Sequence, residues 1–406
     1  MKGNIITGLD IGTHSIKALV AQKKGDEWEV LSYTEVPSFG LRKGAVVNIE
    51  ETSKNIQIIM SGIEKDCNKK ISSVFVNIGG SHLYVTPSDG IISVSRADQI
   101  ISEEDVDRVL QATKAINISK NDEVLEVIPR EFIIDDQKGV KQPEGLTGIR
   151  LEAKVLLLCY FQSYFTNLTQ AVWNSKLQIL SVVPSIMAAA NAVLTQQQKE
   201  LGVALVDIGA ATTSLSIFEE GELIHLAVFP IGSANITNDI AIGLKTEVAI
   251  AEAIKKQYGT CIFSKIEKDQ KNQSNKKIEV FEKSSTLNFT KKDLVDIIEP
   301  RVSEILDLVQ KELKKINRQE LLPAGVVLTG GGAKIPRIRE LTKDTLKLSC
   351  EIGTPRGIIG LQDDPALATV VGLVLEGVDS VCQDGKLVGA GKISSILKKI
   401  FRAFKP

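Results

Sequence analysis

Cysteine and histidine are scarce in this sequence and lie far apart. The 406 residues include five cysteines and three histidines, with no C-x-x-C pair and no Cys/His cluster. This spacing argues against a zinc site and is typical of a reduced, cytoplasmic set of thiols. The scattered histidines predict neither a metal centre nor a catalytic imidazole.

Long apolar runs are also missing. The N-terminus, MKGNIITGLDIG, reaches a glycine after two apolar residues and so lacks the core of a signal peptide. No apolar run approaches the roughly 20 residues that span a bilayer, and the longest candidate, residues 155–161, is typical of a buried strand. Any contact with a membrane is therefore expected to be peripheral.

Neither sign of charge dominates the chain as a whole. The formal charge is -1, which excludes a globally basic nucleic-acid binder, and 43% hydrophobic residues exclude wholesale disorder. Residues 386–406 nevertheless hold six basic side chains and no acidic one, so the rest of the chain carries -7. The sequence predicts an acidic body of two to four domains with a basic tail.

An internal repeat is the most informative positive feature. Residues 5–31 contain three apolar runs separated by a D-I-G-T turn and a polar turn, and residues 203–228 repeat this order around a second D-I-G. Each copy predicts strand, glycine turn, strand, turn and strand. The chain is therefore expected to contain two matching domains.

The segments outside the repeat predict mixed helices and strands. Residues 91–170 suggest a small α/β subdomain with a helix capped at Ser102. Further along, the pattern predicts a helix over 235–258, a polar loop with one short strand over 264–287, a helix over 290–313 that Pro300 kinks or divides, and a glycine-containing linker over 379–392.

The two D-I-G turns carry the candidate chemistry. Backbone N–H groups that converge in a tight turn form an anion cradle, and an adjacent aspartate can hold Mg²⁺ through water. Asp10 and Asp207 would then face each other across a cleft. The simpler alternative is that each aspartate only caps a hairpin turn. A Rossmann site does not match, because the turn at Gly12 leads into a strand instead of a helix.

Four segments resemble the actin, Hsp70 and sugar kinase superfamily. They are GLDIGTHSIKALV, VALVDIGAATTSLSIF, GVVLTGGGAKIPRI and DPALATVVGLVLEG, which look like the two phosphate segments, the adenosine segment and the second connecting helix. The stretches GAVVNIE, ISEEDVDRVL, VIPREFIIDDQKGVKQPEGLTGIRLEAKV and IIEPRVSEIL further resemble the bacterial FtsA family of cell-division proteins. The likeness runs from about residue 4 to residue 377 and returns at the tail.

The resemblance implies an α/β, actin-like fold, a duplicated ribonuclease H-like unit with a relocated small α/β subdomain and a C-terminal amphipathic helix. The implied boundaries are subdomain 1A at 1–86, 166–198 and 363–378; the inserted subdomain 1C at 87–165; subdomain 2A at 199–229 and 301–362; subdomain 2B at 230–300; a flexible linker at 379–392; and the amphipathic helix at 393–406.

The resemblance also implies ATP and Mg²⁺ between the two halves. Asp10 and Asp207 would address the magnesium ion through water. The other implied ligands are Gly12, Thr13, Ser15 and Lys17 for the phosphates on one side, Gly209, Thr212 and Thr213 for the phosphates on the other, Gly330, Gly331 and Gly332 for the adenosine, and Glu252 and Lys255 for the ribose and adenine. A solvated helix pair remains an equal alternative for Glu252 and Lys255.

Two departures from the superfamily pattern bear on hydrolysis. The second turn reads DIGAATT where relatives commonly have DIGGGT, so Ala210 and Ala211 would restrict the approach of the backbone to phosphate. Val183 stands where Hsp70-type and MreB-type relatives carry a carboxylate that helps to position the attacking water. We therefore expect a nucleotide-binding switch with weak ATPase activity at most.

The tail has the pattern of a helix that lies in a membrane interface. Its apolar positions are Ile393, Ile396, Leu397, Ile400, Phe401 and Phe404, and its basic positions are Lys398, Lys399, Arg402 and Lys405. Its four charges would contribute on the order of 4 kcal/mol at an anionic surface, which is reversible for one molecule and firm for a row of molecules. A helix docked on the body or on a partner is the alternative.

The helix IIEPRVSEIL presents Arg301 beside two glutamates. By resemblance this region binds the acidic C-terminal peptide of FtsZ, the tubulin-like ring protein, with Arg301 pairing a carboxylate. An intrahelical salt bridge is the simpler alternative.

Together these features predict a self-assembling, actin-like adaptor that fastens the FtsZ ring to the cytoplasmic face of the cell membrane. Other division proteins are expected as further partners, and nucleic acid is not. One alternative is a pilus-assembly adaptor resembling PilM, which gives no reason for the basic tail. Another is a sugar kinase or Hsp70-like ATPase, for which neither a catalytic base nor a following substrate domain is evident.

Overall fold

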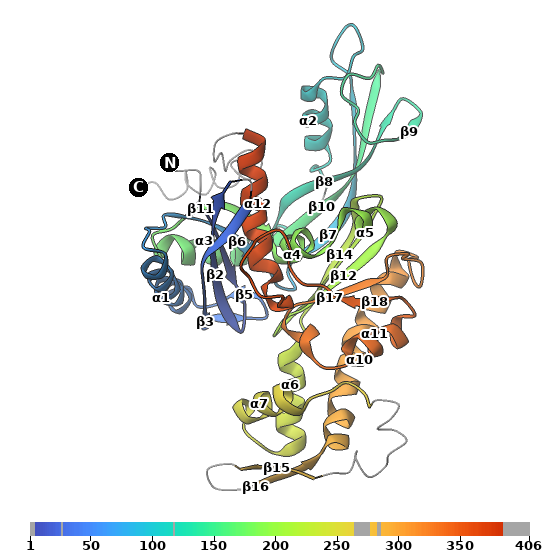
Figure 1. The fold of residues 1–406 in the computed structure, drawn as a ribbon. Helices are drawn as coiled ribbons and strands as arrows, with labels where there is room; N and C mark the ends of the chain where they lie inside the picture. Colours follow the sequence, from blue (N-terminus) through green and yellow to red (C-terminus); the bar gives the residue numbers. More distant parts are fainter. Residues whose placement is uncertain (1–4, 26, 117, 264–276, 282–285, 385–406) are drawn as a thin grey trace.

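Two five-stranded sheets form the centre of the molecule (Figure 1). The computed structural model describes residues 5–25, 27–116, 118–263, 277–281 and 286–384. The first sheet contains β1 (Ile5–Ile11), β2 (Ser15–Lys24), β3 (Glu27–Pro37), β6 (Ser73–Ile78) and β11 (Gln178–Pro184). The second contains β12 (Val203–Ile208), β13 (Thr213–Glu219), β14 (Glu222–Phe229), β17 (Val326–Thr329) and β18 (Cys350–Ile352).

The two sheets repeat one topology. Their strand orders are β11-β6-β1-β2-β3 and β18-β17-β12-β13-β14. In each, three consecutive strands pair antiparallel, and two later strands add in parallel on the other side of the first strand. Their central strands are buried almost throughout, as near-continuous apolar runs require. The internal repeat predicted from the sequence is confirmed.

Four helices accompany the first sheet: α1 (Ile49–Cys67), α3 (Gln162–Asn174), α4 (Ser185–Val193) and α12 (Ala368–Asp384). Helix α1 begins where the side chain of Asn48 accepts a hydrogen bond from the N–H of Glu51. Helices α4 and α12 pack closely because Gly372 has no Cβ, which would collide with the carbonyl oxygen of Ala188.

Helix α12 runs farther than expected. It continues to Asp384, past residue 378 and into the range assigned to the linker, because no glycine or proline interrupts the chain between Gly377 and Gly385. The remainder of the linker and the proposed amphipathic helix lie outside the described residues.

A four-stranded sheet in the order β7-β10-β8-β9 projects from the first half (Figure 1, top). Its elements are β7 (Tyr84–Ser93), β8 (Asp122–Ile134), β9 (Gln137–Val140), β10 (Arg150–Phe161) and α2 (Glu103–Ala112), which packs on one face. Ser102 and Asp105 form the capping box of α2, as the sequence predicts.

At the opposite end lie α6 (Ser233–Leu244), α7 (Val248–Tyr258), the hairpin β15 (Lys277–Phe281) and β16 (Thr286–Thr290), and α10 (Lys291–Lys315). The single helix predicted over 235–258 is wrong, because Lys245 adopts a left-handed conformation with φ 53° and ends α6. Two strands replace the one expected, because the apolar residues around 277–281 and 286–290 pair with each other. Pro300 lies inside α10 without dividing it.

Short elements complete the chain: β4 (Leu41–Arg42), β5 (Ala45–Val46), α5 (Gln196–Leu201), η1 (Gly331–Lys334), α11 (Ile338–Leu346) and η2 (Pro365–Leu367). One apolar core crosses between the halves, since it combines Val193 of α4 with Phe218 and Leu226 of the second sheet. The two sheets are therefore joined along a common packed surface.

Candidate functional site

Asp10 and Asp207 occupy the same position in the two repeated sheets. Each lies one residue before the end of its strand, opposite Lys17 in β2 or Ser214 in β13. The turns that follow are closed by equivalent hydrogen bonds, from Gly12 N to Ser15 O at 3.1 Å and from Gly209 N to Thr212 O at 2.9 Å. The repeat thus places two aspartates beside two matching turns.

The negative charge of Asp10 acts on the carboxyl group of Asp207. Burial, together with the negative charge of Asp10, raises the pKa of Asp207 to about 6, and Lys17 opposes that shift. Burial also raises the pKa of Asp10, again against the charge of Lys17. A nearby cation favours the ionised form of carboxylates that burial otherwise keeps from ionising.

Both turns offer backbone donors. Within the described part of the chain, the N–H groups of Thr13, His14, Ala210 and Ala211 have no acceptor. The Thr13 hydroxyl accepts a hydrogen bond from the N–H of Gly44 at 3.0 Å. Unpaired N–H groups in a tight turn are the feature that binds phosphate oxygens, so the turns fit an anion.

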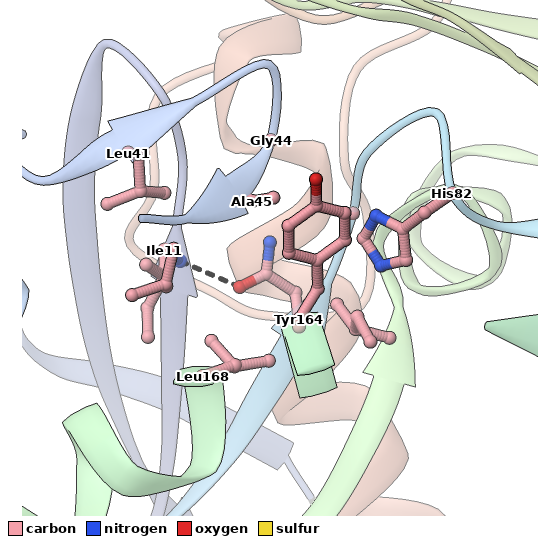
Figure 2. Close-up of a pocket in the computed structure, with 11 residues that line it drawn as sticks. Ile11, Leu41, Gly44, Ala45, His82, Tyr164 and Leu168 are labelled. Carbon is pink, nitrogen blue, oxygen red and sulfur yellow. Dashed lines mark hydrogen bonds between the residues drawn. The ribbon is translucent and has the colours of Figure 1, made fainter. Parts of the chain in front are cut away.

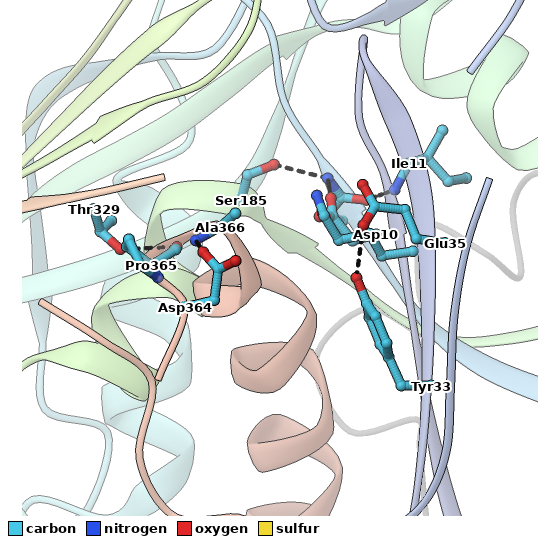
Figure 3. Close-up of polar contacts among 11 residues, drawn as sticks. Asp10, Ile11, Tyr33, Glu35, Ser185, Thr329, Asp364, Pro365 and Ala366 are labelled. Atoms are coloured by element: carbon cyan, nitrogen blue, oxygen red, sulfur yellow. Dashed lines mark hydrogen bonds and ion pairs between the residues drawn. The ribbon is translucent and has the colours of Figure 1, made fainter. Parts of the chain in front are cut away.

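Lys17 lies between two acids on the first sheet. Its Nζ is 3.5 Å from Asp10 Oδ2, and it stands opposite Glu35 in the strand pairing. Although burial opposes the change, a hydrogen bond from Ser15 and the charge of Lys17 hold the pKa of Glu35 below its usual range. Tyr33 donates to Glu35 Oε2 at 2.9 Å, as Figure 3 shows. Ser15, Lys17 and Glu35 thus form one polar group beside Asp10.

The three glycines after β17 differ in the space that surrounds each of them. A Cβ on Gly330, at φ 81°, would collide with the carboxylate of Asp207, and one on Gly332 would collide with the side chain of Ile208. A Cβ on Gly331 would meet no heavy atom within 4 Å. Gly330 and Gly332 therefore serve the packing of the turn on β12, and Gly331 is the one with open space for a ligand.

Glu252 and Lys255 lie close to the second turn. Lys255 is only 8% exposed, and its Nζ contacts Glu252 Oε2 at 2.7 Å, Thr237 Oγ1 at 2.7 Å and Ser233 O at 3.2 Å. The alternative of a solvated pair is therefore wrong for Lys255. Helix α6 begins on this turn, since Ser233 N and Ala234 N donate to the carbonyls of Gly209 and Ala210.

Thr213 has a different position from the other phosphate candidates. It is completely buried, and its hydroxyl donates to Ile231 O at 2.9 Å. Thr212 supplies its carbonyl oxygen to the turn. The chain thus uses both residues in its own hydrogen bonds.

Sequence reasoning missed polar residues that come from distant segments. Asn77 contacts Asp10 from β6, and Lys334 Nζ pairs with Asp364 Oδ2 at 2.7 Å beside the start of α12. Thr329 donates to Pro365 O at 3.2 Å, as Figure 3 also shows. Glu35 lies just beyond the predicted unit of residues 5–31, on the same face of β3 as Tyr33, whereas the others depend on contacts between remote segments.

The donor set of the site fits hydrated Mg²⁺ better than a metal held by protein ligands alone. Among the described residues there is no group of three His, Cys, Asp or Glu side chains placed to hold a metal. Magnesium keeps several waters and often takes only one or two carboxylates plus phosphate. Asp10, Asp207 and the two turns meet that requirement.

A small cavity lies behind β1, lined by residues that include Ile11, Gly44, His82 and Tyr164 (Figure 2). Its volume is about 10 Å³, room for about one water and too little for a nucleotide. Val183 is only 7% exposed, and its side chain carries no polar atom.

Arg301 already has a carboxylate partner. Its guanidinium forms a bidentate ion pair with Asp239 of α6, at 2.6 Å from Nε and 2.9 Å from Nη2, and it also contacts Glu304. The pairing between helices was not anticipated, because Asp239 is remote in sequence.

No helix in the described part of the chain is both long and apolar enough to span a bilayer.

Comparison with known proteins identifies the family. The model described as "Cell division protein FtsA" matches residues 204–372, and that of the "SHS2 domain inserted in FTSA" matches residues 80–159. FtsA of Pseudomonas aeruginosa is 37% identical over 93% of this chain and 90% of its own length. The chain belongs to the FtsA family of cell-division proteins. FtsA of Bacillus subtilis is 32% identical over 95% of this chain and 85% of that protein.

Solved structures place this FtsA-family chain in the actin-like fold. The PilM–PilN type IV pilus biogenesis complex contains a chain that matches with a TM-score of 0.66 at 17% identity, over 92% of this chain and 98% of that one. MreB5 of Spiroplasma citri bound to ADP matches with a TM-score of 0.57 at 13% identity, over 95% and 100%. The predicted fold class and family are confirmed.

Proposed function

We propose that this FtsA-family chain binds ATP with Mg²⁺ between its two sheets and, in that form, assembles into filaments that attach an FtsZ ring to the membrane. The observation that carries the nucleotide site is the matched pair of Asp10 and Asp207, each beside a turn whose N–H groups have no acceptor within the described residues. One carboxylate beside one such turn would be a common surface feature, whereas two buried carboxylates from repeated sheets, with the charge of Asp10 acting on Asp207, are a specific arrangement.

Different residues of the chain would bind different parts of the nucleotide. The two turns donate N–H groups to phosphate oxygens, and Lys17 adds a positive charge beside Asp10. Gly331 leaves room for the adenosine, and Lys255 with Glu252 would contact the ribose or the base from α7. Magnesium, when bound, would neutralise phosphate charge between Asp10 and Asp207.

Weak hydrolysis follows from the residues around Val183. A buried valine side chain can neither orient water nor accept its proton, and the hydroxyl of Ser185, two residues further along the chain, is engaged with Asn77 and with Ile78 O. Without a group that orients the nucleophile, ATP would persist long enough to act as a switch. Filament formation would then supply the avidity that a single tail lacks.

Membrane and FtsZ attachment rest on the sequence and on the family. The basic apolar tail from Ile393 to Lys405 would lie in the interface of anionic lipid. Arg301 would receive a carboxylate of the acidic FtsZ peptide, in exchange for Asp239.

Isothermal titration with ATP tests the nucleotide site. We expect the wild-type chain to bind ATP in Mg²⁺, and Asp10→Asn together with Asp207→Asn to lose about 10- to 100-fold in affinity, since the cation then loses both carboxylates. Asp296→Asn together with Asp307→Asn, at two exposed positions of α10, is the matched control, because it removes the same charge. Unchanged affinity in the double variant would contradict the site.

A further inference from the structure

The two aspartates are equivalent in topology but differ in their surroundings. Strand β6 runs parallel to β1, pairs Val76 with Leu9 and brings the next residue, Asn77, to Asp10. Strand β17 runs parallel to β12 and pairs Thr329 with Asp207. Asn77 and Thr329 therefore occupy the same position in the repeated unit. Because the two positions are equivalent, the contacts of Asn77 with Asp10 can be compared directly with those of Thr329 near Asp207.

Asn77 is fixed by three hydrogen bonds. It is only 4% exposed, and its Oδ1 accepts from the N–H of Ile11 at 2.7 Å. Its Nδ2 donates to Asp10 Oδ1 at 2.9 Å and to Ser185 Oγ at 3.0 Å. Because the N–H of Ile11 can only donate, the amide oxygen must face it and the NH₂ group must face Asp10. Dashed lines mark these contacts beside Ser185, Asp10 and Ile11 in Figure 3.

Thr329 makes no corresponding contact with Asp207. Its hydroxyl lies 3.1 Å from Gly353 O and 3.2 Å from Pro365 O, both carbonyl acceptors. No described residue donates a hydrogen bond to the carboxylate of Asp207. One carboxylate of the pair is held by the scaffold, and the other is not.

We propose that Asn77 is a positioning residue that fixes the carboxylate of Asp10 for the metal–nucleotide complex, so that Asp10 is the preorganised partner and Asp207 the adaptable one. This inference rests on the proposed function. With Oδ1 held by Asn77, Asp10 leaves Oδ2 as the oxygen available to a cation. Among the described residues that oxygen contacts Lys17 alone, at the long distance of 3.5 Å.

Ser185 extends the arrangement to helix α4. Its hydroxyl accepts from Asn77 and donates to Ile78 O at 3.1 Å. Because Ser185 is the first residue of α4, the orientation of Asp10 depends on how α4 packs on the end of β6. Partners of this kind typically affect metal affinity 10- to 100-fold, because they set the orientation of the ligand.

Binding of ATP measured in Mg²⁺ and again in EDTA tests the proposal. We expect Asn77→Ala to reduce ATP affinity about 10- to 100-fold in Mg²⁺ and by less than about twofold in EDTA, where the cation that Asp10 serves is absent. Thr329→Val, at the equivalent position of the second sheet, should leave the ratio of the two affinities unchanged. A melting curve of each variant reports its stability separately.

The possible results distinguish the positioning role of Asn77 from the proposed binding of ATP. Equal losses in Mg²⁺ and in EDTA, or no loss for Asn77→Ala, would overturn the positioning role. A wild-type chain that binds no ATP in either buffer would overturn the proposed function and this inference with it. If Asn77→Ala fails to fold, Ser185→Ala tests the positioning role instead. This substitution removes one hydrogen bond that restrains Asn77, and it should lower ATP affinity in Mg²⁺ but not in EDTA.

Discussion

Arg301 is paired with Asp239 in this structure, so an acidic peptide that binds Arg301 must displace an internal carboxylate. The ion pair is bidentate, joins α10 to α6, and leaves Arg301 28% and Asp239 24% exposed. Substituting Asp239→Asn keeps the shape of the side chain and removes its charge. If the peptide carboxylate and Asp239 compete for one guanidinium, the substitution should strengthen peptide binding.

The size of the effect follows from the burial of the pair. A hydrogen bond to a charged group contributes about 1.5–3 kcal/mol when shielded, and an exposed ion pair about 0–1 kcal/mol. The partly exposed pair lies between these limits, at about 1–2 kcal/mol. At 1.4 kcal/mol per tenfold change, Asp239→Asn should bind an acidic peptide about 5- to 30-fold more tightly.

Fluorescence anisotropy with a labelled acidic peptide from the C-terminus of FtsZ measures this change. Asp296→Asn removes the same charge from an exposed position of α10 and should change affinity less than about twofold after screening by salt. Arg301→Gln should weaken binding. The reasoning is refuted if Asp239→Asn weakens binding, because Asp239 would then orient Arg301 instead of competing for it.

Three further predictions follow from the glycine turn, the tail and the inserted subdomain. Gly330→Ala should lower the melting temperature, since it combines a strained φ of 81° with a collision against Asp207, whereas Gly331→Ala should leave melting unchanged and affect only nucleotide affinity. Deleting residues 393–406 should abolish co-sedimentation with anionic vesicles while ATP affinity stays the same, and persistent sedimentation would exclude the tail as the anchor. Hydrogen bonds led by that from Ser102 hold the pKa of Asp105 well below its usual range, so its contribution to stability is complete above the ordinary aspartate value and lost as the pH falls below it. Asp105→Asn should accordingly cost about 1–2 kcal/mol of unfolding free energy near neutral pH, measured by chemical denaturation.

The sequence was sufficient for features that depend on local pattern. The alternation of apolar runs and D-I-G turns predicted both triple-stranded units, and the Ser102 to Asp105 spacing predicted the cap of α2. The break between α6 and α7 was missed, because Lys245 adopts a left-handed backbone that glycine or asparagine would have signalled and lysine does not. The end of α12 was placed too early, because the glycines at 385, 389 and 391 marked all of 379–392 as a linker, although no glycine or proline stands between Gly377 and Gly385.

The contacts that distinguish the two halves of the site could not be predicted in this way. A repeat predicts equivalent backbone positions, yet Asn77 holds Asp10 while Thr329, at the matching position, bonds to Gly353 and Pro365 instead. The difference arises because the chain after β18 passes close to Thr329, whereas the chain after β11 brings a hydroxyl, Ser185, to Asn77. Duplication therefore fixes where two carboxylates stand, and the later, unrelated segments of the chain decide which of them is held.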